Sequence, residues 1–153
     1  MSVLGELAAD ILEYEFDGDS SIATSGAISG WLEANLGQLN SLIYTEYSGA
    51  DAALDLEAQS IHKELYLHNY YTRQSRNALK GIAAGGSGDV LSLSDADSSV
   101  TFVNRNEVAK VYRGLAKDHK ESIDKLVGQY NIYQSQPRQV GGVEGDWYTG
   151  TYP

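Results

Sequence analysis

The sequence predicts a mainly α-helical protein: a helical bundle of two long helices plus a shorter one, with a small β-hairpin between helices and an extended C-terminal arm. Apolar residues recur at steps of three and four over most of the chain, the spacing of one buried helix face. Residues 51–80 contain neither Gly nor Pro, whereas residues 135–153 hold four Gly and two Pro without apolar periodicity. These three observations predict the fold class.

A chain of 153 residues fits one domain. Its composition divides it into an acidic N-terminal segment (1–19), a helical domain (20–134) with the hairpin near 90–103, and an extended tail (135–153). No internal repeat is found. The division gives the helical domain most of the apolar residues and leaves the two ends to other roles.

The first elements are short. Residues 3–14 mix apolar residues with acids, which predicts a short amphipathic helix. The Asp- and Gly-rich residues 17–21 predict a turn. A clearer helix follows, capped by Thr24 or Ser25 and ending at Ser48-Gly49. Its apolar stripe comprises Ile28, Trp31, Leu32, Leu36, Leu39, Leu42 and Ile43.

A long second helix is predicted over residues 51–80. Its stripe comprises Leu54, Ala58, Ile61, Leu65, His68, Thr72 and Leu79. Residues 90–93 and 100–103 have the composition of strands, and the Asp- and Ser-rich residues between them can turn a hairpin. An isolated hairpin is marginal in water, so we expect it to lean on a neighbouring subunit.

The third helix is predicted from about residue 105 to 134. Asn104 and Glu107 have the spacing of a capping box, and Pro137 stops the helix. Its apolar stripe comprises Val108, Val111, Tyr112, Leu115, His119, Ile123, Leu126, Tyr130 and Tyr133. Most of its Lys and Arg residues fall off this stripe.

Charge is distributed unevenly along the chain. Residues 1–60 carry eleven Asp and Glu and no Lys or Arg, whereas residues 61–153 carry ten acids and eleven bases. One interpretation is a solvated acidic stretch that aids solubility. The other is a polarised subunit that associates head to tail and closes into a ring. The net charge of −10 argues against free-standing nucleic-acid binding, which needs a basic surface.

The sequence lacks the residues that several kinds of site or segment require. Cys is absent, and no apolar run is long enough to span a membrane. The acidic first fifteen residues resemble neither a signal nor a transit peptide. Residues 17–28 and 95–106 lack the Gly and Glu that a calcium loop needs at its sixth and twelfth positions. We therefore predict a non-enzyme without metal or cofactor.

The three histidines, His62, His68 and His119, form no metal-binding motif. His68 and His119 lie on apolar stripes. The sequence favours satisfied core or interface histidines over metal ligands.

Aromatic residues supply the candidate sites. The chain has eleven Tyr and two Trp, residue types that are enriched at interfaces because they are apolar at one end and hydrogen-bond at the other. The predicted interface residues are Trp147, Tyr148 and Tyr152 in the tail, Val100 and Phe102 in the hairpin, and Tyr66 and Tyr70 in the second helix. The alternative is that Tyr66, Tyr70, Tyr130 and Tyr133 pack within one subunit, where the long helices meet.

Four segments resemble head–tail connector (adaptor) proteins, the small helical neck proteins of tailed bacteriophages and cyanophages. They are residues 30–43 (GWLEANLGQLNSLI), 61–71 (IHKELYLHNYY), 106–112 (NEVAKVY) and 130–133 (YNIY). The likeness covers roughly residues 20–140 and lies in segment style and element order.

The resemblance implies a virion protein at the head–tail interface. It implies a homo-oligomeric ring, commonly a dodecamer, that lies below the portal protein and surrounds a channel for double-stranded DNA. It also implies a C-terminal arm that reaches an adjacent neck or tail protein. A stopper, another neck ring, fits the same residues. An alternative from another class is a soluble acidic regulator that mimics DNA or binds a basic host protein through residues 1–60. A hydrolase with a diffuse carboxylate site ranks last.

Overall fold

The computed structural model describes residues 2–83, 92–95, 98–101 and 105–135, and this part of the chain is mainly α-helical. Its helices are α1 (Val3–Glu15), α2 (Ser25–Ala34), α3 (Leu36–Ile43), α4 (Leu56–Ala83) and α5 (Arg105–Ser135). The expected mainly α class is confirmed. Helices α1 and α5 match their predicted ranges closely, whereas α4 begins at Leu56 rather than at residue 51.

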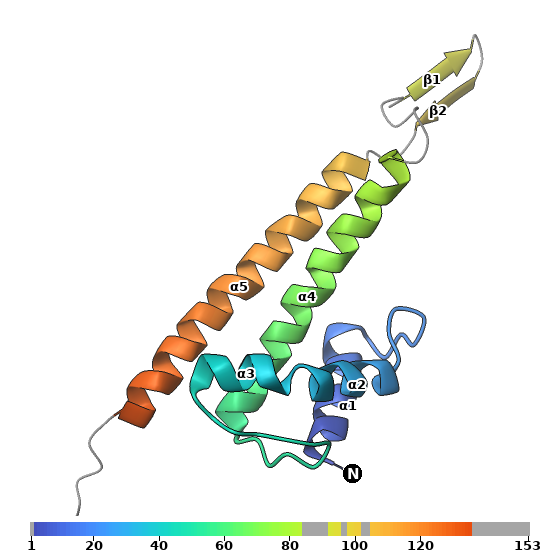
Figure 1. The fold of residues 1–153 in the computed structure, drawn as a ribbon. Coiled ribbons are helices and arrows are strands. Elements are labelled where there is room, and N and C mark those ends of the chain that lie inside the picture. The colour runs from blue at the N-terminus through green and yellow to red at the C-terminus, as the bar shows by residue number, and fades with distance from the viewer. Residues whose placement is uncertain (1, 84–91, 96–97, 102–104, 136–153) are drawn as a thin grey trace, which may run out of the picture.

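Helices α4 and α5 lie side by side and antiparallel, and together we call them the arm (Figure 1). They contain 28 and 31 residues, which corresponds to lengths of about 42 and 46 Å. Asp55 caps α4, because its Oδ1 accepts a hydrogen bond from the backbone N–H of Ala58 at 2.7 Å. This cap explains why the helix begins where it does.

Helices α1–α3 and their loops, residues 2–54, form a compact base that covers only the first half of α4 (Figure 1). In α1 the buried residues are Leu4, Leu7, Ala8 and Ile11, the i, i+3, i+4, i+7 pattern of one face. Thr24 caps α2 by accepting a bond from the N–H of Ala27 at 3.2 Å, as predicted. The predicted turn is also present, with φ of 52° at Asp17 and 70° at Gly18.

The core lies where the base meets the first half of α4. Its most enclosed side chains are Ile28, Leu32, Leu39, Ile61 and Leu67, each no more than 1 % exposed. A fully buried Leu or Ile contributes about 1.5–3 kcal/mol to stability. Helix α5 adds only Ile123 and Tyr130 to this cluster, both from its second half.

The other half of the arm lies outside the core. We define the distal arm as residues 72–83 and 105–117, where α4 and α5 extend beyond the base (Figure 1). Ala109 and Ala116 are buried there between α4 and α5 but do not belong to the core cluster. Two short antiparallel strands, β1 (Ser92–Asp95) and β2 (Ser98–Thr101), pair with Leu93 opposite Val100. They lie closer together in sequence than the predicted strands.

Two expectations about the helices are wrong. The predicted single helix through residues 28–43 breaks at Asn35 and ends at Ile43, so it forms α2 and α3 and stops short of Ser48. The apolar stripe of α5 is not buried throughout, because Val111 is 63 % and Tyr133 is 71 % exposed. No described element of this chain covers these two positions.

Candidate functional site

Tyr66 and Tyr70, two predicted interface residues, lie in an aromatic cluster that joins the base to the arm. Tyr66 on α4 packs edge-on against Trp31 of α2 and Phe16 after α1, with ring centroids 5.3 and 6.4 Å apart. Tyr70 lies 4.8 Å from Phe16 and 5.3 Å from Tyr71. The cluster therefore fastens α1 and α2 to the middle of α4.

Within this cluster Tyr66 retains little surface for a partner, since only 8 % of it is exposed. Tyr70 is half-buried. Burial raises the pKa of Tyr66, Tyr70 and Tyr71 above the usual tyrosine value, so the hydroxyls stay neutral. For Tyr66 the geometry favours packing within one subunit, although against α1 and α2 rather than against α5.

Polar contacts join α4 to α5 at mid-arm. Nδ1 of His119 lies 2.7 Å from Oε2 of Glu64, and its ring stacks on Tyr71 with centroids 5.4 Å apart and planes within 7°. Nδ1 of His68 lies 2.7 Å from the carbonyl oxygen of Ala116 and, facing a carbonyl, donates to it. Further along, Nε of Arg113 donates to the hydroxyl of Ser75 at 3.3 Å. These contacts fix the register of the two helices.

His62 is the third histidine, and it lies in the core. It is fully buried, and its Nε2 lies 2.9 Å from the carbonyl oxygen of Leu32. Its Nδ1 has no hydrogen-bond partner among the described residues. Burial lowers the pKa of His62 below the usual value, so the ring stays neutral, with its proton on Nε2. Each of the three histidines makes a hydrogen bond within the chain, but the prediction of satisfied histidines fails for His62, whose buried Nδ1 has no partner among the described residues.

The Glu64–His119 pair has the form of a carboxylate that orients an imidazole, which in hydrolases activates a hydroxyl. Here the carboxylate contacts Nδ1, and none of the hydrogen bonds among the described residues joins the ring to a hydroxyl. No group of three or more potential metal ligands occurs in the described part of the chain. The pair therefore joins α4 to α5.

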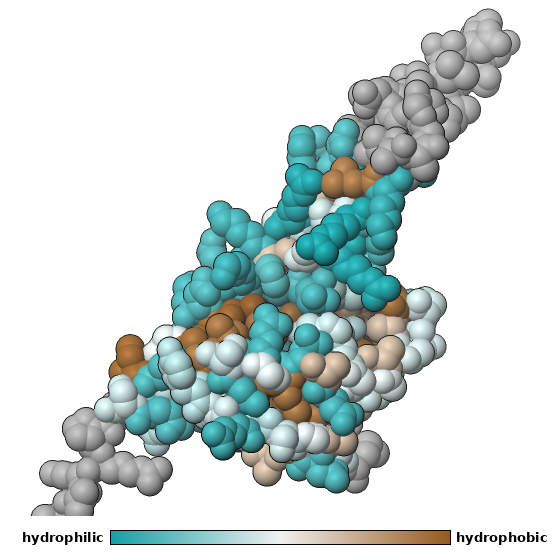
Figure 2. Space-filling model, in the orientation of Figure 1, coloured by the Kyte–Doolittle hydropathy of each residue, from teal (hydrophilic) through white to brown (hydrophobic). Residues whose placement is uncertain are grey.

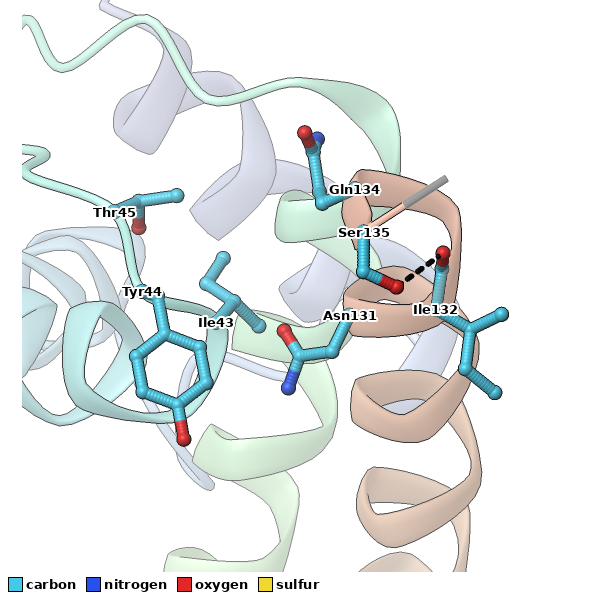
Figure 3. A pocket seen from close by; sticks show the side chains of 7 residues that line it. All are labelled: Ile43, Tyr44, Thr45, Asn131, Ile132, Gln134 and Ser135. Atoms are coloured by element: carbon cyan, nitrogen blue, oxygen red, sulfur yellow. Dashed lines mark hydrogen bonds between the residues drawn. The ribbon is translucent and has the colours of Figure 1, made fainter. Parts of the chain in front are cut away.

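A cavity of about 550 Å³ opens where the end of α3 meets the end of α5 (Figure 3). It is lined by Ile43, Tyr44, Thr45, Asn131, Ile132, Gln134 and Ser135. Two of its polar side chains bond internally: Asn131 Nδ2 donates to the Leu42 carbonyl at 3.1 Å, and the Ser135 hydroxyl donates to the Ile132 carbonyl at 2.9 Å. A small-molecule site needs polar groups that converge on a ligand, which this mainly apolar opening lacks.

Apolar side chains surround this opening. Tyr44 is 86 % exposed, held outward by a left-handed backbone with φ of 55°, and Ile132 is 66 % exposed. Exposed aromatic and aliphatic side chains that gather at one place are typical of protein contacts. Neither residue is among the predicted interface residues: Tyr44 falls within a helix that the sequence predicts to continue to Ser48, and Ile132 lies off the apolar stripe of α5.

The charge asymmetry of the sequence becomes an asymmetry in space. The base, residues 2–54, carries most of the eleven Asp and Glu of residues 1–60 and neither Lys nor Arg. The distal arm carries one acidic residue, Glu107, and seven Lys and Arg residues. The seven are Arg73, Arg76, Lys80, Arg105, Lys110, Arg113 and Lys117. Hydrophilic side chains dominate this part of the molecular surface (Figure 2). One end of the subunit is acidic and the other is basic.

The remaining predicted interface residues fall mostly outside the described part of the chain. Phe102, Trp147, Tyr148 and Tyr152 all lie in such segments. Val100 belongs to β2, where its Cα is paired with that of Leu93. For these five residues the interface assignment stays a prediction.

Searches against protein-family models, curated proteins and solved structures found no match for this chain. Among the described residues, no helix combines the length and the apolar character needed to cross a membrane.

Proposed function

We propose that this chain is a non-enzymatic structural protein of a tailed-phage virion. In this proposal it is a head–tail connector, or adaptor, whose copies form a ring between the portal protein and the tail. The observation that carries the proposal is the bipolar subunit, with an acidic base at one end and a basic two-helix arm at the other. Such a subunit fits head-to-tail association, which closes into a ring when the rotation between copies permits.

The long arm supports a role in a wall. Two antiparallel helices of 28 and 31 residues, cross-linked by histidines and a buried core, make a stiff element. A bundle of such arms would surround a channel for double-stranded DNA. The net charge of −10 suits this passage, because like charge lowers the affinity for phosphate.

Two further parts of the chain are assigned to partners. The hairpin of β1 and β2 clasps a neighbouring subunit, with Val100 and Phe102 at the contact, since a lone hairpin is marginal in water. The tail, residues 135–153, docks on the adjacent neck or tail protein through Trp147, Tyr148 and Tyr152. A stopper ring would use the same parts, and only its place in the neck differs.

Electron microscopy of purified virions tests the proposal. The chain is expected as a ring, with twelve copies as the leading number, at the vertex where the tail meets the head. If it occurs in infected cells and never in particles, the proposal is wrong. A monomer that instead retains a basic host protein, in a contact that salt disrupts, would favour the acidic regulator.

A further inference from the structure

The distal arm carries two basic stripes with the same spacing. On α4 they are Arg73, Arg76 and Lys80, and on α5 they are Lys110, Arg113 and Lys117. Positions i, i+3 and i+7 fall on one side of a helix, so each stripe is continuous over about 10 Å. We call these six residues the basic face.

Both stripes lie on the same side of the arm. Arg76 directly follows buried Ser75, and Lys110 and Lys117 directly follow buried Ala109 and Ala116. Each stripe is thus displaced in the same rotational sense from the α4–α5 contact. Two antiparallel helices are related by a two-fold axis perpendicular to the plane that contains both of them. This rotation exchanges the helices but keeps each face of the pair on its own side, so positions displaced in the same sense share one face. Arg113 reaches across that face to the Ser75 hydroxyl, as the 3.3 Å contact shows.

The positive charge of the basic face is only partly offset. Among the described residues, Arg73, Arg76 and Lys80 form no ion pair. Lys110 pairs with Glu107 at 2.7 Å, and Lys117 lies 3.6 Å from Glu121. These pairs are exposed and contribute little in water, so an external carboxylate can replace them.

The best complement among the described elements is helix α1. Glu6, Asp10 and Glu13 are all exposed and occupy positions i, i+4 and i+7, a stripe about 10 Å long. We call them the acidic face. The opposite side of α1 is buried in the core through Leu4 and Ile11, which holds the three carboxylates outward. Charge sign and length therefore match one basic stripe, and the steps of four and three match its steps of three and four when the two helices run antiparallel.

We propose that the basic face of one copy binds the acidic face of α1 of the next copy. This contact rests on the proposed function, since it names the surfaces by which subunits associate. The contact is heterologous, because it joins two different surfaces. Each copy uses both faces once, so a series of copies can close into a ring. A second copy is favoured over nucleic acid, because the net charge of −10 repels phosphate at long range.

Two charge-reversal variants of the full chain test the contact. The first carries Glu6→Lys, Asp10→Lys and Glu13→Lys, and the second carries Arg73→Glu, Arg76→Glu and Lys80→Glu. A matched control reverses three other exposed acids of the base, Glu33→Lys, Glu46→Lys and Asp51→Lys. Far-UV circular dichroism checks that each variant is folded. Neutral replacements, Glu→Gln, Asp→Asn, Arg→Gln and Lys→Gln, substitute for any variant that does not fold.

Sedimentation velocity then measures self-association at about 0.1 M and about 1 M salt, where the screening lengths are about 10 and 3 Å. The wild type and the control are expected to associate at low salt and to dissociate at high salt. Each variant alone should associate at least about tenfold more weakly. An equimolar mixture of the two variants should recover association in part, because the unchanged basic face of the first variant can bind the unchanged acidic face of the second.

The other outcomes overturn the inference in distinguishable ways. If the reversed variants associate like the wild type, this contact is wrong and the ring uses other surfaces, which leaves the proposed function intact. If the wild type is monomeric at every concentration, the contact is wrong, while microscopy of virions still decides the function. If only the arm variant loses binding to a DNA duplex and association is unchanged, the basic face binds phosphate instead.

Discussion

The side chain of Asp55 connects three parts of the molecule by hydrogen bonds. Its Oδ1 caps α4, while its Oδ2 accepts hydrogen bonds from the hydroxyls of Tyr47 at 3.1 Å and Tyr130 at 2.9 Å. Burial, followed by the bonds to Tyr47 and Asp55, raises the pKa of Tyr130 above its usual value, so this hydroxyl stays a donor. The base, the start of α4 and the end of α5 therefore meet at a single carboxylate.

The first prediction concerns this junction. Tyr130→Phe removes one hydrogen bond to a charged acceptor and is expected to lower the free energy of unfolding by about 1–2 kcal/mol. The matched control is Tyr133→Phe on the same helix, because Tyr133 is 71 % exposed and should tolerate the loss of its hydroxyl. Urea denaturation measures both changes. Equal stability of the two variants would show that the Tyr130–Asp55 bond does not contribute.

The second prediction concerns pH and His62. Because burial lowers the pKa of His62 in the folded state, the unfolded chain binds more protons once the pH falls below the unfolded value of about 6.5. Its contribution to stability is complete above that value and declines as the pH falls. The decline from this one group is at most about 1.4 kcal/mol per pH unit.

His62→Gln isolates this contribution, since the variant keeps a donor for the Leu32 carbonyl but cannot titrate. Chemical denaturation between pH 7 and pH 5 is expected to show a shallower loss of stability for the variant than for the wild type. The carboxylates titrate equally in both proteins and cancel in the comparison. Identical pH profiles would mean that His62 becomes protonated without penalty in the folded chain.

At the scale of the element, apolar periodicity predicts where helices exist better than where they end. The stripe that contains Leu32, Leu36 and Leu39 is buried as expected, yet Asn35 interrupts the helix. The side-chain amide of Asn35 donates to the Trp31 carbonyl at 2.8 Å, which also accepts the backbone N–H of Asn35 at 3.0 Å, so this residue caps the end of α2. Gly37 weakens helix propensity further. Because α2 and α3 bury the same stripe, its spacing carries no sign of the break.

Apolar periodicity also does not predict which parts of the arm are buried. The spacing of Val111 and Leu115 predicts a buried face, but burial needs a partner element, and the base stops short of the distal arm. Where the base covers α5, Ile123 and Tyr130 on the same stripe are buried. Which helices lie against which half depends on contacts far apart in sequence, such as Phe16 with Tyr70 and Glu15 with Lys63 at 2.8 Å. No local pattern encodes them.

The third prediction follows from this uneven burial. The distal arm is a two-helix segment with small or polar residues at its contact, including Ser75, Ala109 and Ala116, and it lacks the core cluster. Local opening there is expected to need less free energy than in the other half. Hydrogen–deuterium exchange of the isolated chain should be faster in residues 72–80 than in 60–67, and faster in 109–117 than in 121–133.

Each comparison lies within one helix and leaves out its first turn, whose N–H groups lack intrahelical acceptors. Dilute protein at about 1 M salt keeps subunits apart, given a screening length of about 3 Å. Uniform protection along α4 would contradict the prediction. If protection of the distal arm rises with protein concentration at low salt, that rise reports the contact between copies.

At the scale of the whole molecule, the sequence already contains the charge asymmetry, and the fold converts it into two separate ends. Residues 1–60 supply the acidic base and the distal arm supplies seven bases. The order of the long helices and the acidic N-terminal part could be predicted. The position of the basic face could not, because it depends on the register of α4 against α5, which Glu64–His119 and Arg113–Ser75 set.

The final prediction concerns the tail. Deleting residues 141–153 is expected to leave the helical content unchanged, because the core cluster among the described residues is formed by side chains between Leu4 and Tyr130. The melting temperature should stay within about 2 °C of the full chain, since distant and independent sites act additively on stability. Far-UV circular dichroism and a thermal melt measure both quantities.

The same deletion should abolish docking to the adjacent neck or tail component, because buried Trp and Tyr anchors commonly contribute 2 kcal/mol or more each to an interface. Co-sedimentation with that component measures the loss. Replacing Trp147, Tyr148 and Tyr152 by Ala in the full-length chain separates the anchors from chain length and should weaken docking at least about thirtyfold. If the truncated chain unfolds, the tail belongs to the core. If it stays folded and docks as before, another surface, such as the exposed Tyr44 and Ile132 beside the α3–α5 cavity, holds the partner.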